Sequence, residues 1–549
     1  MNAQRRLSRG LPFFLLSMSL GCGVARASAP AVSDSFGSYP APSAEETARV
    51  KAAFRDAAAR TVGERSGDLF VLPAKYSYVT DGGHRTPTLA HYKGQPMQNG
   101  GTVHGNSWEY DTRIPIVLWG PGFVRPGVQT DASATQQDLT PTYAHLMGTV
   151  PPEDAYGRVL DEALVPTSRR PKVILTLVFD QGGEVYYRAH PGATPRIDAL
   201  KKEGTYFTSA KVSHVDVETG IGHSAIGTGA WPSRTGISSN NFWIRAFGSP
   251  RYSFAGDVDN SPLFLGSPTL GDVWLRASEN QALVAGYCYA DRAAIGMAGH
   301  GSLYAGNKKP WVIFYDEKAG KLTTNRQYYA LPGYLEGASP KAHLDALTGG
   351  TGRWMDHPID PKSKVRVTPA FAAFDGDNVV KLIEQEPWGA DDITDLMYVT
   401  LKSTDAAGHS YGHESDEAGA VLAEQDKQLG RIIDALVAKV GRENLVVALT
   451  ADHGSTPLAE LSKGVALDDA KLVADLNRQL DKRSNGVNVF EYASATQLFI
   501  NEAERVRNGL SYDQLKRAVL AYKVDGKPFF VDAVTRPEAT ERASRLAKP

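Results

Sequence analysis

The stretch KVILTLVFDQGG, residues 172–183, decides the fold. It is a continuous run of apolar and β-branched residues that ends in an aspartate, a glutamine and two glycines. Such a run is typical of a strand buried on both faces, as in a parallel sheet. Five further runs of the same kind, each ending in a polar cluster, are DLFVLP (68–73), RIPIVLWGPG (113–122), QALVAGYCYADR (281–292), LMYVTLKSTDAAGH (396–409) and NLVVALTADHGS (444–455).

Helical patterns lie between these runs. The clearest one begins after Ser415, a favourable N-cap residue, and ends before Gly441, a favourable C-cap residue. Alternating strands, polar loops and helices predict a doubly wound α/β sheet, an α/β/α sandwich. Ligands bind such sheets beyond the carboxyl ends of the strands, where the polar clusters lie. Residues 241–370 are richer in glycine and aromatic residues, and we expect them to form a cap-like insertion over the site.

Length and charge narrow the classes of protein. A chain of 549 residues is too long for one simple core, so we expect either one large α/β domain with insertions or two domains. The formal net charge of -2 provides no basic surface and argues against a nucleic-acid partner. The two cysteines are Cys22 and Cys288, so no disulfide is expected within the mature chain.

The first residues have the pattern of an export signal. A basic start, an apolar run from Leu11 to Val24 and small residues after it predict a signal peptide over residues 1–27. The run is too short for a transmembrane helix, which needs about 20 apolar residues. Alternatives are a twin-arginine signal at Arg5 and Arg6 and a lipoprotein site at Cys22. We therefore expect a periplasmic or extracellular protein without a stable membrane span, in which residues 28–65 form a linker and a surface helix.

Three of the predicted strand ends carry acidic residues or histidines. They are Asp180, the pair Asp405 and His409, and the pair Asp452 and His453. Each motif alone is more often a turn or a helix cap, but together they form a ligand set suited to zinc. The loop HVDVETGIGHSAIGTGAWPSRTGI (214–237) follows the first strand and supplies hydroxyl groups. Two zinc ions roughly 3.5–4 Å apart could hold a phosphoryl group and activate such a hydroxyl.

Several motifs together resemble the alkaline phosphatase superfamily. They are LVFDQGG (177–183), ETGIGHSAIGTGAWPSRTGI (218–237), NNFW (240–243), STDAAGHSYG (403–412) and TADHGSTPLAE (450–460). The resemblance is closest to the phosphate-insensitive alkaline phosphatases with a single threonine and to the type I phosphodiesterases and nucleotide pyrophosphatases. It implies that Thr219 is the nucleophile and a zinc ligand together with Asp180, Asp452 and His453. Asp405 and His409 would then bind the second zinc ion.

The resemblance requires one more histidine near the C-terminus, yet no histidine follows His453. The segments NGGTVHGNSWEYDTRIPIVLWGPGFVRPG (99–127) and TQQDLTPTYAHLMGTVPPEDAYGRVLDEAL (135–164) resemble the C-terminal part of the family. We infer a circular permutation in which residues 66–165 are the displaced C-terminal segment and residues 172–549 are the remainder of the catalytic domain. His104 would supply the last zinc ligand. His413, four residues after His409, is the alternative.

The resemblance leaves the substrate class open. Asn240, or else Asn241, matches the asparagine that binds phosphoryl oxygens in the monoesterases, and Arg292 matches their arginine. Their lysine is replaced here by Ala290, which weakens the case for a monoesterase because a monoester dianion carries more charge than a diester. We expect a phosphomonoesterase that forms a phosphothreonine and acts on a small phosphate ester, with no expectation for the oligomeric state. Alternatives are a phosphodiesterase or nucleotide pyrophosphatase and an inactive ligand-binding relative, whereas the cysteine or serine motif of the sulfatases is absent.

Overall fold

The structure is a computed structural model that describes residues 39–80, 89–97, 100–306, 308–483 and 485–546. The predicted signal peptide over residues 1–27 and Cys22 lie outside the described residues. Across the described ranges, no helix is both long enough and apolar enough to pass through a membrane.

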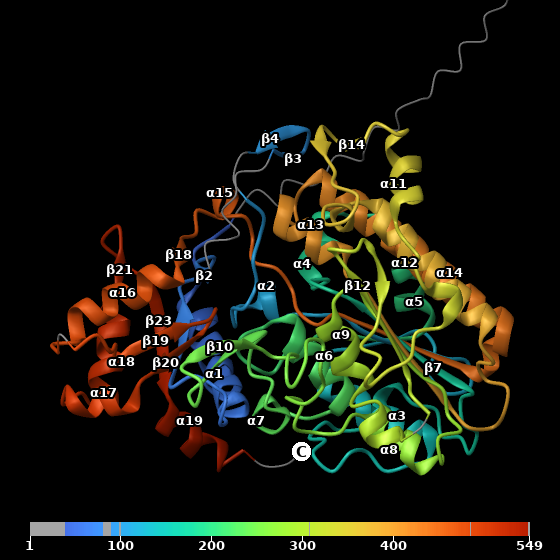
Figure 1. Ribbon diagram of the computed structural model, residues 1–549, viewed down its shortest axis with the longest axis horizontal. Coiled ribbons are helices and arrows are strands. Elements are labelled where there is room, and N and C mark those ends of the chain that lie inside the picture. Colours follow the sequence, from blue (N-terminus) through green and yellow to red (C-terminus); the bar gives the residue numbers. More distant parts are fainter. Residues whose placement is uncertain (1–38, 81–88, 98–99, 307, 484, 547–549) are drawn as a thin grey trace, which may run out of the picture. The chain divides into compact units, whose positions relative to one another are not determined.

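A nine-stranded sheet forms the centre of the described chain (Figure 1). Its strand order is β13 (Lys321–Thr323), β12 (Trp311–Asp316), β11 (Val284–Tyr287), β16 (Asp395–Leu401), β7 (Val173–Phe179), β17 (Leu445–Thr450), β5 (Ile116–Trp119), β8 (Thr205–Phe207) and β6 (Val128–Thr130). The five strands from β12 to β17 are parallel, whereas β5 runs antiparallel to β17 and to β8. All residues of β7, β16 and β17 are buried, as their continuous apolar sequences predict.

Helices cover both faces of this sheet, which confirms the predicted α/β/α fold class. Figure 1 shows α12 (Pro369–Gln385) and α14 (Asp416–Val440) on one side and α6 (Thr219–Thr228) and α9 (Asp291–Ala298) on the other. Helix α14 has Ser415 as its N-cap and Gly441 as its C-cap, as the sequence predicts. The Ser415 hydroxyl accepts a hydrogen bond from the amide of Ala418, which satisfies a donor that the first helical turn leaves open.

A second, smaller sheet joins the two ends of the described chain. It consists of β19 (Phe490–Ala493), β20 (Gln497–Ile500), β1 (Leu69–Pro73) and β23 (Phe530–Thr535), all antiparallel. Figure 1 shows the blue segment of β1 beside these red strands. The DLFVLP run therefore lies outside the parallel sheet in which the sequence pattern suggested it. Its residues are nevertheless fully buried, because packed helices and loops cover this sheet too.

The range 241–370 is only partly separate from the central sheet, which corrects the expectation of one cap-like insertion. Strands β11 and β12 fall within it and extend the parallel sheet beyond β16. The parts outside the sheet include the hairpin of β9 (Asn241–Ile244) and β10 (Ser249–Tyr252), helix α11 (Lys341–Thr348), and the hairpin of β14 (Arg353–Trp354) and β15 (His357–Pro358).

The remaining elements surround these two sheets. The helices are α1 (Ala44–Thr61), α2 (Glu109–Thr112), α3 (Leu139–Met147), α4 (Glu184–Ala189), α5 (Pro195–Glu203), α7 (Pro232–Thr235), α8 (Leu270–Ala277), α10 (Ser302–Ala305), α13 (Ser403–Tyr411), α15 (Ala459–Ser462), α16 (Asp469–Leu480), α17 (Glu502–Arg507), α18 (Tyr512–Ala521) and α19 (Arg536–Ala543). The short strands are β2 (Tyr78–Thr80), β3 (Ala90–Tyr92), β4 (Gln95–Met97), β18 (Ala466–Asp468), β21 (Lys523–Val524) and β22 (Lys527–Pro528).

Candidate active site

The register of three parallel strands brings polar side chains together at one edge of the sheet. Phe179 at the end of β7 pairs with Leu401 at the end of β16, and Val178 pairs with Thr450 at the end of β17. Asp180 directly follows β7, and Lys402 directly follows β16. Asp452 follows β17 after one intervening residue, Ala451. These side chains therefore start from adjacent strand ends, where doubly wound sheets bind their ligands.

Asp180, Asp452 and His453 form the first of two groups at these strand ends that have the spacing of metal ligands, and all three are buried. Nε2 of His453 lies 3.2 Å from Oδ2 of Asp452 and 3.6 Å from Oδ1 of Asp180. Among the described residues, none of these three atoms has a hydrogen-bond partner. Buried polar atoms that converge without partners are costly unless a further group satisfies them, and a bound cation would do so.

The second group consists of His104, Asp405 and His409. Nε2 of His409 lies 3.1 Å and Nε2 of His104 lies 3.7 Å from Oδ1 of Asp405. Asp405 and His409 are one turn apart on α13, whereas His104 comes from the loop before α2. His413 does not belong to this group, because its Nδ1 lies 3.0 Å from the Ser455 hydroxyl and its Nε2 lies 3.5 Å from Glu414.

Three backbone carbonyls set the tautomers of the histidines in these groups. Nδ1 of His104 lies 2.7 Å from the carbonyl oxygen of Val217, and Nδ1 of His409 lies 2.9 Å from that of Thr102. Nδ1 of His453 lies 3.0 Å from the carbonyl oxygen of Gly454. Because a carbonyl oxygen can only accept, each Nδ1 carries a proton, and in the neutral ring Nε2 is then the nitrogen that can bind a metal ion. This arrangement is typical of histidines that bind metals through Nε2.

Burial also keeps two of these histidines neutral. It lowers the pKa of His453 to about 3 and holds the pKa of His104 well below its usual value. Neutral imidazole is the form that binds metal ions. Burial and the neighbouring Asp180 carboxylate raise the pKa of Asp452 well above its usual value. Such crowded carboxylates would be stabilised by a cation. The rings of His104 and His453 stack with centroids 3.7 Å apart, so the two groups adjoin.

Lys402 is a buried cation between the two groups. The sequence analysis did not predict it. Its Nζ lies 2.7 Å from Oδ2 of Asp180 and 2.7 Å from Oδ2 of Asp405. The histidines approach the other oxygen, Oδ1, of each carboxylate. Burial lowers the pKa of Lys402, but the two carboxylates outweigh burial and raise it above its usual value. The ammonium therefore bridges the two groups and leaves the oxygens that face the histidines accessible to a metal ion.

Thr219 is the first residue of α6, and its hydroxyl meets Lys402. Nζ of Lys402 donates a hydrogen bond of 3.1 Å to Oγ1 of Thr219. The hydroxyls of Ser224 and Thr228 instead donate to backbone carbonyls within α6. A Cβ atom at Gly222 would lie 2.7 Å from the carbonyl oxygen of Asp452, so a side chain there would push the helix away from Asp452.

A cavity of about 1110 Å³ opens onto the second group and is lined, among others, by His104, Asp405, His409, Asn240 and Arg292. Oδ1 of Asn240 accepts a hydrogen bond of 2.8 Å from the amide of Gly220. Its amide nitrogen is the remaining group that can donate to a ligand. Nε of Arg292 is buried and has no hydrogen-bond partner among the described residues. Ala290 lines the same cavity as the N-cap residue of α9.

The sequence-predicted residues thus lie in one region of the structure. Asp180, Asp452 and His453 form one group, and His104, Asp405 and His409 form the other. Thr219 contacts both through Lys402. A signal for Lys402 is present in the sequence, because this residue lies directly at the end of an apolar run, but a lysine does not belong to the zinc-ligand pattern of acidic residues and histidines.

Comparison with known proteins shows which family this sequence matches. The model of the family described as type I phosphodiesterase / nucleotide pyrophosphatase matches residues 174–545. The chain is 27% identical to the alkaline phosphatase PafA of Elizabethkingia meningoseptica over 64% of this chain and 73% of PafA. It is 31% identical to the alkaline phosphatase PhoD of Zymomonas mobilis over 55% of this chain, and this match spans only 56% of PhoD.

Comparison with a solved structure supports the same fold. A crystal structure of a PafA variant superposes with a TM-score of 0.50 at 23% identity, over 65% of this chain and 77% of that chain. The matched family model covers well over half of the sequence. The chain therefore belongs to the type I phosphodiesterase / nucleotide pyrophosphatase family of the alkaline phosphatase superfamily, and it is a phosphoric ester hydrolase.

Proposed function

We propose that this chain is an alkaline phosphatase-type phosphomonoesterase that uses Thr219 as its nucleophile at a centre of two zinc ions. The observation that carries this proposal is the convergence of two groups of ligand atoms beside one threonine hydroxyl at the N-terminus of a helix. Asp180, Asp452, His453 and Thr219 would hold one ion, and the group of His104, Asp405 and His409 would hold the other. Bound zinc supplies positive charge that lowers the pKa of a hydroxyl and stabilises a phosphoryl group.

The residues of the chain account for the remaining steps. Oγ1 of Thr219 gives up its proton and attacks phosphorus, the bond from phosphorus to the ester oxygen breaks, and the alcohol leaves carrying that proton in the net reaction. Water then attacks the phosphothreonine, which releases phosphate and restores the hydroxyl of Thr219. Arg292 and the side-chain amide of Asn240 line the cavity and would donate hydrogen bonds to the phosphoryl oxygens.

We further infer that Lys402 supplies the positive charge that is missing at Ala290. Its ammonium contacts the attacking oxygen and lies between the two metal groups. From that position it can stabilise negative charge on Thr219 and on the transferring phosphoryl group. This contact supports a monoesterase, because a monoester dianion brings more negative charge to the centre than a diester.

The runner-up function is that of a phosphodiesterase or nucleotide pyrophosphatase. The description of the matched family model supports this alternative. The deciding experiment compares hydrolysis of an aryl phosphate monoester with hydrolysis of the corresponding diester by the zinc-loaded chain. A higher kcat/KM for the monoester supports the proposal. A higher kcat/KM for the diester contradicts it and favours the runner-up, and no hydrolysis of either ester would indicate an inactive ligand-binding relative.

Replacing Ala290 with lysine tests how the charge at the centre is supplied. Ala290 lines the same cavity as Arg292 and Asn240, the residues proposed to bind the phosphoryl oxygens. We expect this variant to raise kcat/KM for the monoester more than for the diester. Steady-state kinetics with both esters measure the effect. An equal change for both, or no change, would mean that Lys402 already fills the role or that position 290 is not equivalent to the lysine of the monoesterases.

The proposed role of His104 is tested by metal content. His104→Ala should bind about one zinc equivalent less than the wild type, because only Asp405 and His409 remain in that group, whereas His413→Ala should bind as much as the wild type. Mass spectrometry for zinc on the dialysed proteins measures the result. Zinc loss in His413→Ala but not in His104→Ala would reverse the assignment.

We also propose that the chain is circularly permuted, with residues 66–165 as the displaced C-terminal segment and 172–549 as the remainder. Two observations support this. The match to the family model begins only at residue 174, and the preceding segment contributes β5 to the central sheet and His104 to the second metal group. We further propose that residues 1–27 direct export to the periplasm or beyond.

A further inference from the structure

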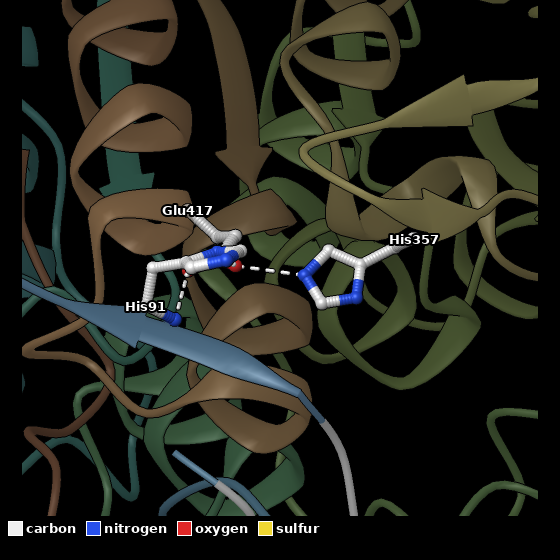
Figure 2. Close-up of side chains that lie close together, drawn as sticks. All are labelled: His91, His357 and Glu417. Carbon is white, nitrogen blue, oxygen red and sulfur yellow. Dashed lines mark hydrogen bonds and ion pairs between the residues drawn. The ribbon is translucent and has the colours of Figure 1, made fainter. Parts of the chain in front are cut away.

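A third group of side chains with ligand spacing lies outside the catalytic residues (Figure 2). It consists of His91 on β3, His357 on β15 and Glu417 in the first turn of α14. Nδ1 of His91 lies 2.6 Å and Nε2 of His357 lies 2.7 Å from the same atom, Oε1 of Glu417. Figure 2 shows the two rings approaching this oxygen from different elements.

The surrounding structure fixes the carboxylate at the centre of this group. The side chain of Glu417 is fully buried, whereas those of His91 and His357 are 20% and 11% exposed. The second oxygen of Glu417, Oε2, accepts a hydrogen bond of 3.1 Å from the backbone amide of His91. Oε1 is therefore held in a fixed direction, between two imidazole nitrogens that come from segments far apart in the sequence.

We propose that His91, His357 and Glu417 bind a divalent transition-metal ion, and that Zn²⁺ is the ion that suits them. Two imidazoles and one carboxylate are a ligand set that zinc accepts, with water in the fourth position. The three ligand atoms lie within 4.8 Å of one another. Small ring rotations would bring them to the Zn–N distances of about 2.0–2.1 Å and Zn–O distances of about 2.0–2.2 Å. The partial exposure of both histidines leaves room for the water and for entry of the ion.

An ion at this site would connect three parts of the fold. The hairpin of β3 and β4, the hairpin of β14 and β15, and the start of α14 each contribute one ligand. The ring of His357 also packs against Tyr411, with centroids 4.6 Å apart. Tyr411 is the last residue of α13, which carries Asp405 and His409. The ion would therefore stabilise the position of α13, which carries two residues of the second group, without contacting the substrate.

Zinc content tests the proposal. The full chain is loaded with Zn²⁺ and dialysed, and bound zinc is measured by mass spectrometry in the wild type and in His357→Ala and Glu417→Gln. We expect each variant to bind one equivalent less than the wild type. Glu417→Gln is the gentler change because it keeps the shape of the side chain. His343→Ala is the matched control, since His343 pairs with a single carboxylate, that of Asp377, and should lose no zinc.

A second measurement needs no variant. Anomalous scattering at the zinc edge from crystals of the wild-type protein grown with Zn²⁺ should show a peak between the rings of His91 and His357. Unchanged zinc content in folded His357→Ala and Glu417→Gln overturns the proposal. If both variants fail to fold, absence of the anomalous peak at saturating Zn²⁺ overturns it. The zinc ions proposed near Thr219 would have different ligands and would give separate peaks, so the two proposals can fail independently.

Discussion

Thr219→Ala should abolish turnover of phosphate esters while zinc binding stays close to that of the wild type. The hydroxyl of Thr219 is the group proposed to attack phosphorus, and Lys402 donates a hydrogen bond directly to it. Removing a covalent nucleophile from a hydrolase costs roughly 10³-fold or more in kcat. Asp180, Asp452 and His453 remain in place, so the proposed metal site would keep three of its ligands. Steady-state kinetics and zinc analysis on the same preparation measure both quantities.

Ser224→Ala is the matched control for this variant. Ser224 lies on the same buried helix, but its hydroxyl donates to the carbonyl oxygen of Gly220 within α6. Its loss should cost stability, on the order of 1 kcal/mol for one hydrogen bond, without a comparable loss of kcat. Activity near the wild-type level in Thr219→Ala would exclude Thr219 as the nucleophile. A comparable loss in both variants would indicate that damage to α6, rather than loss of the nucleophile, explains the result.

The strand ends were the most predictable part of the site. A continuous apolar run predicts a central strand, and the polar residue that follows it must lie at the carboxyl end of that strand. This reasoning located Asp180, Asp405 and Asp452, and the structure brings them together. The fold class followed from the same pattern, because alternating strands and helices allow few other architectures. Helix α14 was predictable to the residue from its caps.

Sheet membership and cross-chain contacts were less predictable. The run at β1 is as apolar as β7, yet it pairs antiparallel with β20 and β23. A continuous apolar run indicates that a strand is buried on both faces, but it does not indicate the direction of the strand or its pairing partner. Strand β12 was hidden in a range rich in glycine and aromatic residues, whereas the run that forms β11 was predicted as a strand but lies in the range assigned to the insertion. The position of a strand in a sheet is set by pairings between distant segments, and no local pattern encodes those pairings.

The group of His91, His357 and Glu417 illustrates the same limit for side chains. None of the three belongs to a short motif, and they meet only because two hairpins dock at the start of α14. Lys402 differs, because the register of β16 against β7 places it beside Asp180. Its position could be read from the sequence, but its role required knowing that the adjacent strand ends in a carboxylate.

Lys402→Met should reduce kcat/KM for the monoester by about 10²–10³-fold, the loss typical of removing one group that stabilises charge in the transition state. Methionine keeps much of the length of the side chain but removes the ammonium that contacts Thr219, Asp180 and Asp405. The diester should be affected less, because it brings less negative charge.

The same substitution should also lower stability. Measuring stability beside kcat/KM separates the structural role of Lys402, as a counter-ion, from its role in the reaction. Breaking a buried ion pair by removing one partner costs about 3–5 kcal/mol, so denaturant unfolding of the metal-stripped protein should show a loss of this size. The control Lys364→Met removes an exposed lysine at the cavity wall and should show neither effect. Adding Ala290→Lys to Lys402→Met should restore part of the monoester activity if the two positions supply the same charge. A variant that lost stability but kept its kcat/KM for the monoester would leave Lys402 as a structural counter-ion of Asp180 and Asp405, with no part in the reaction.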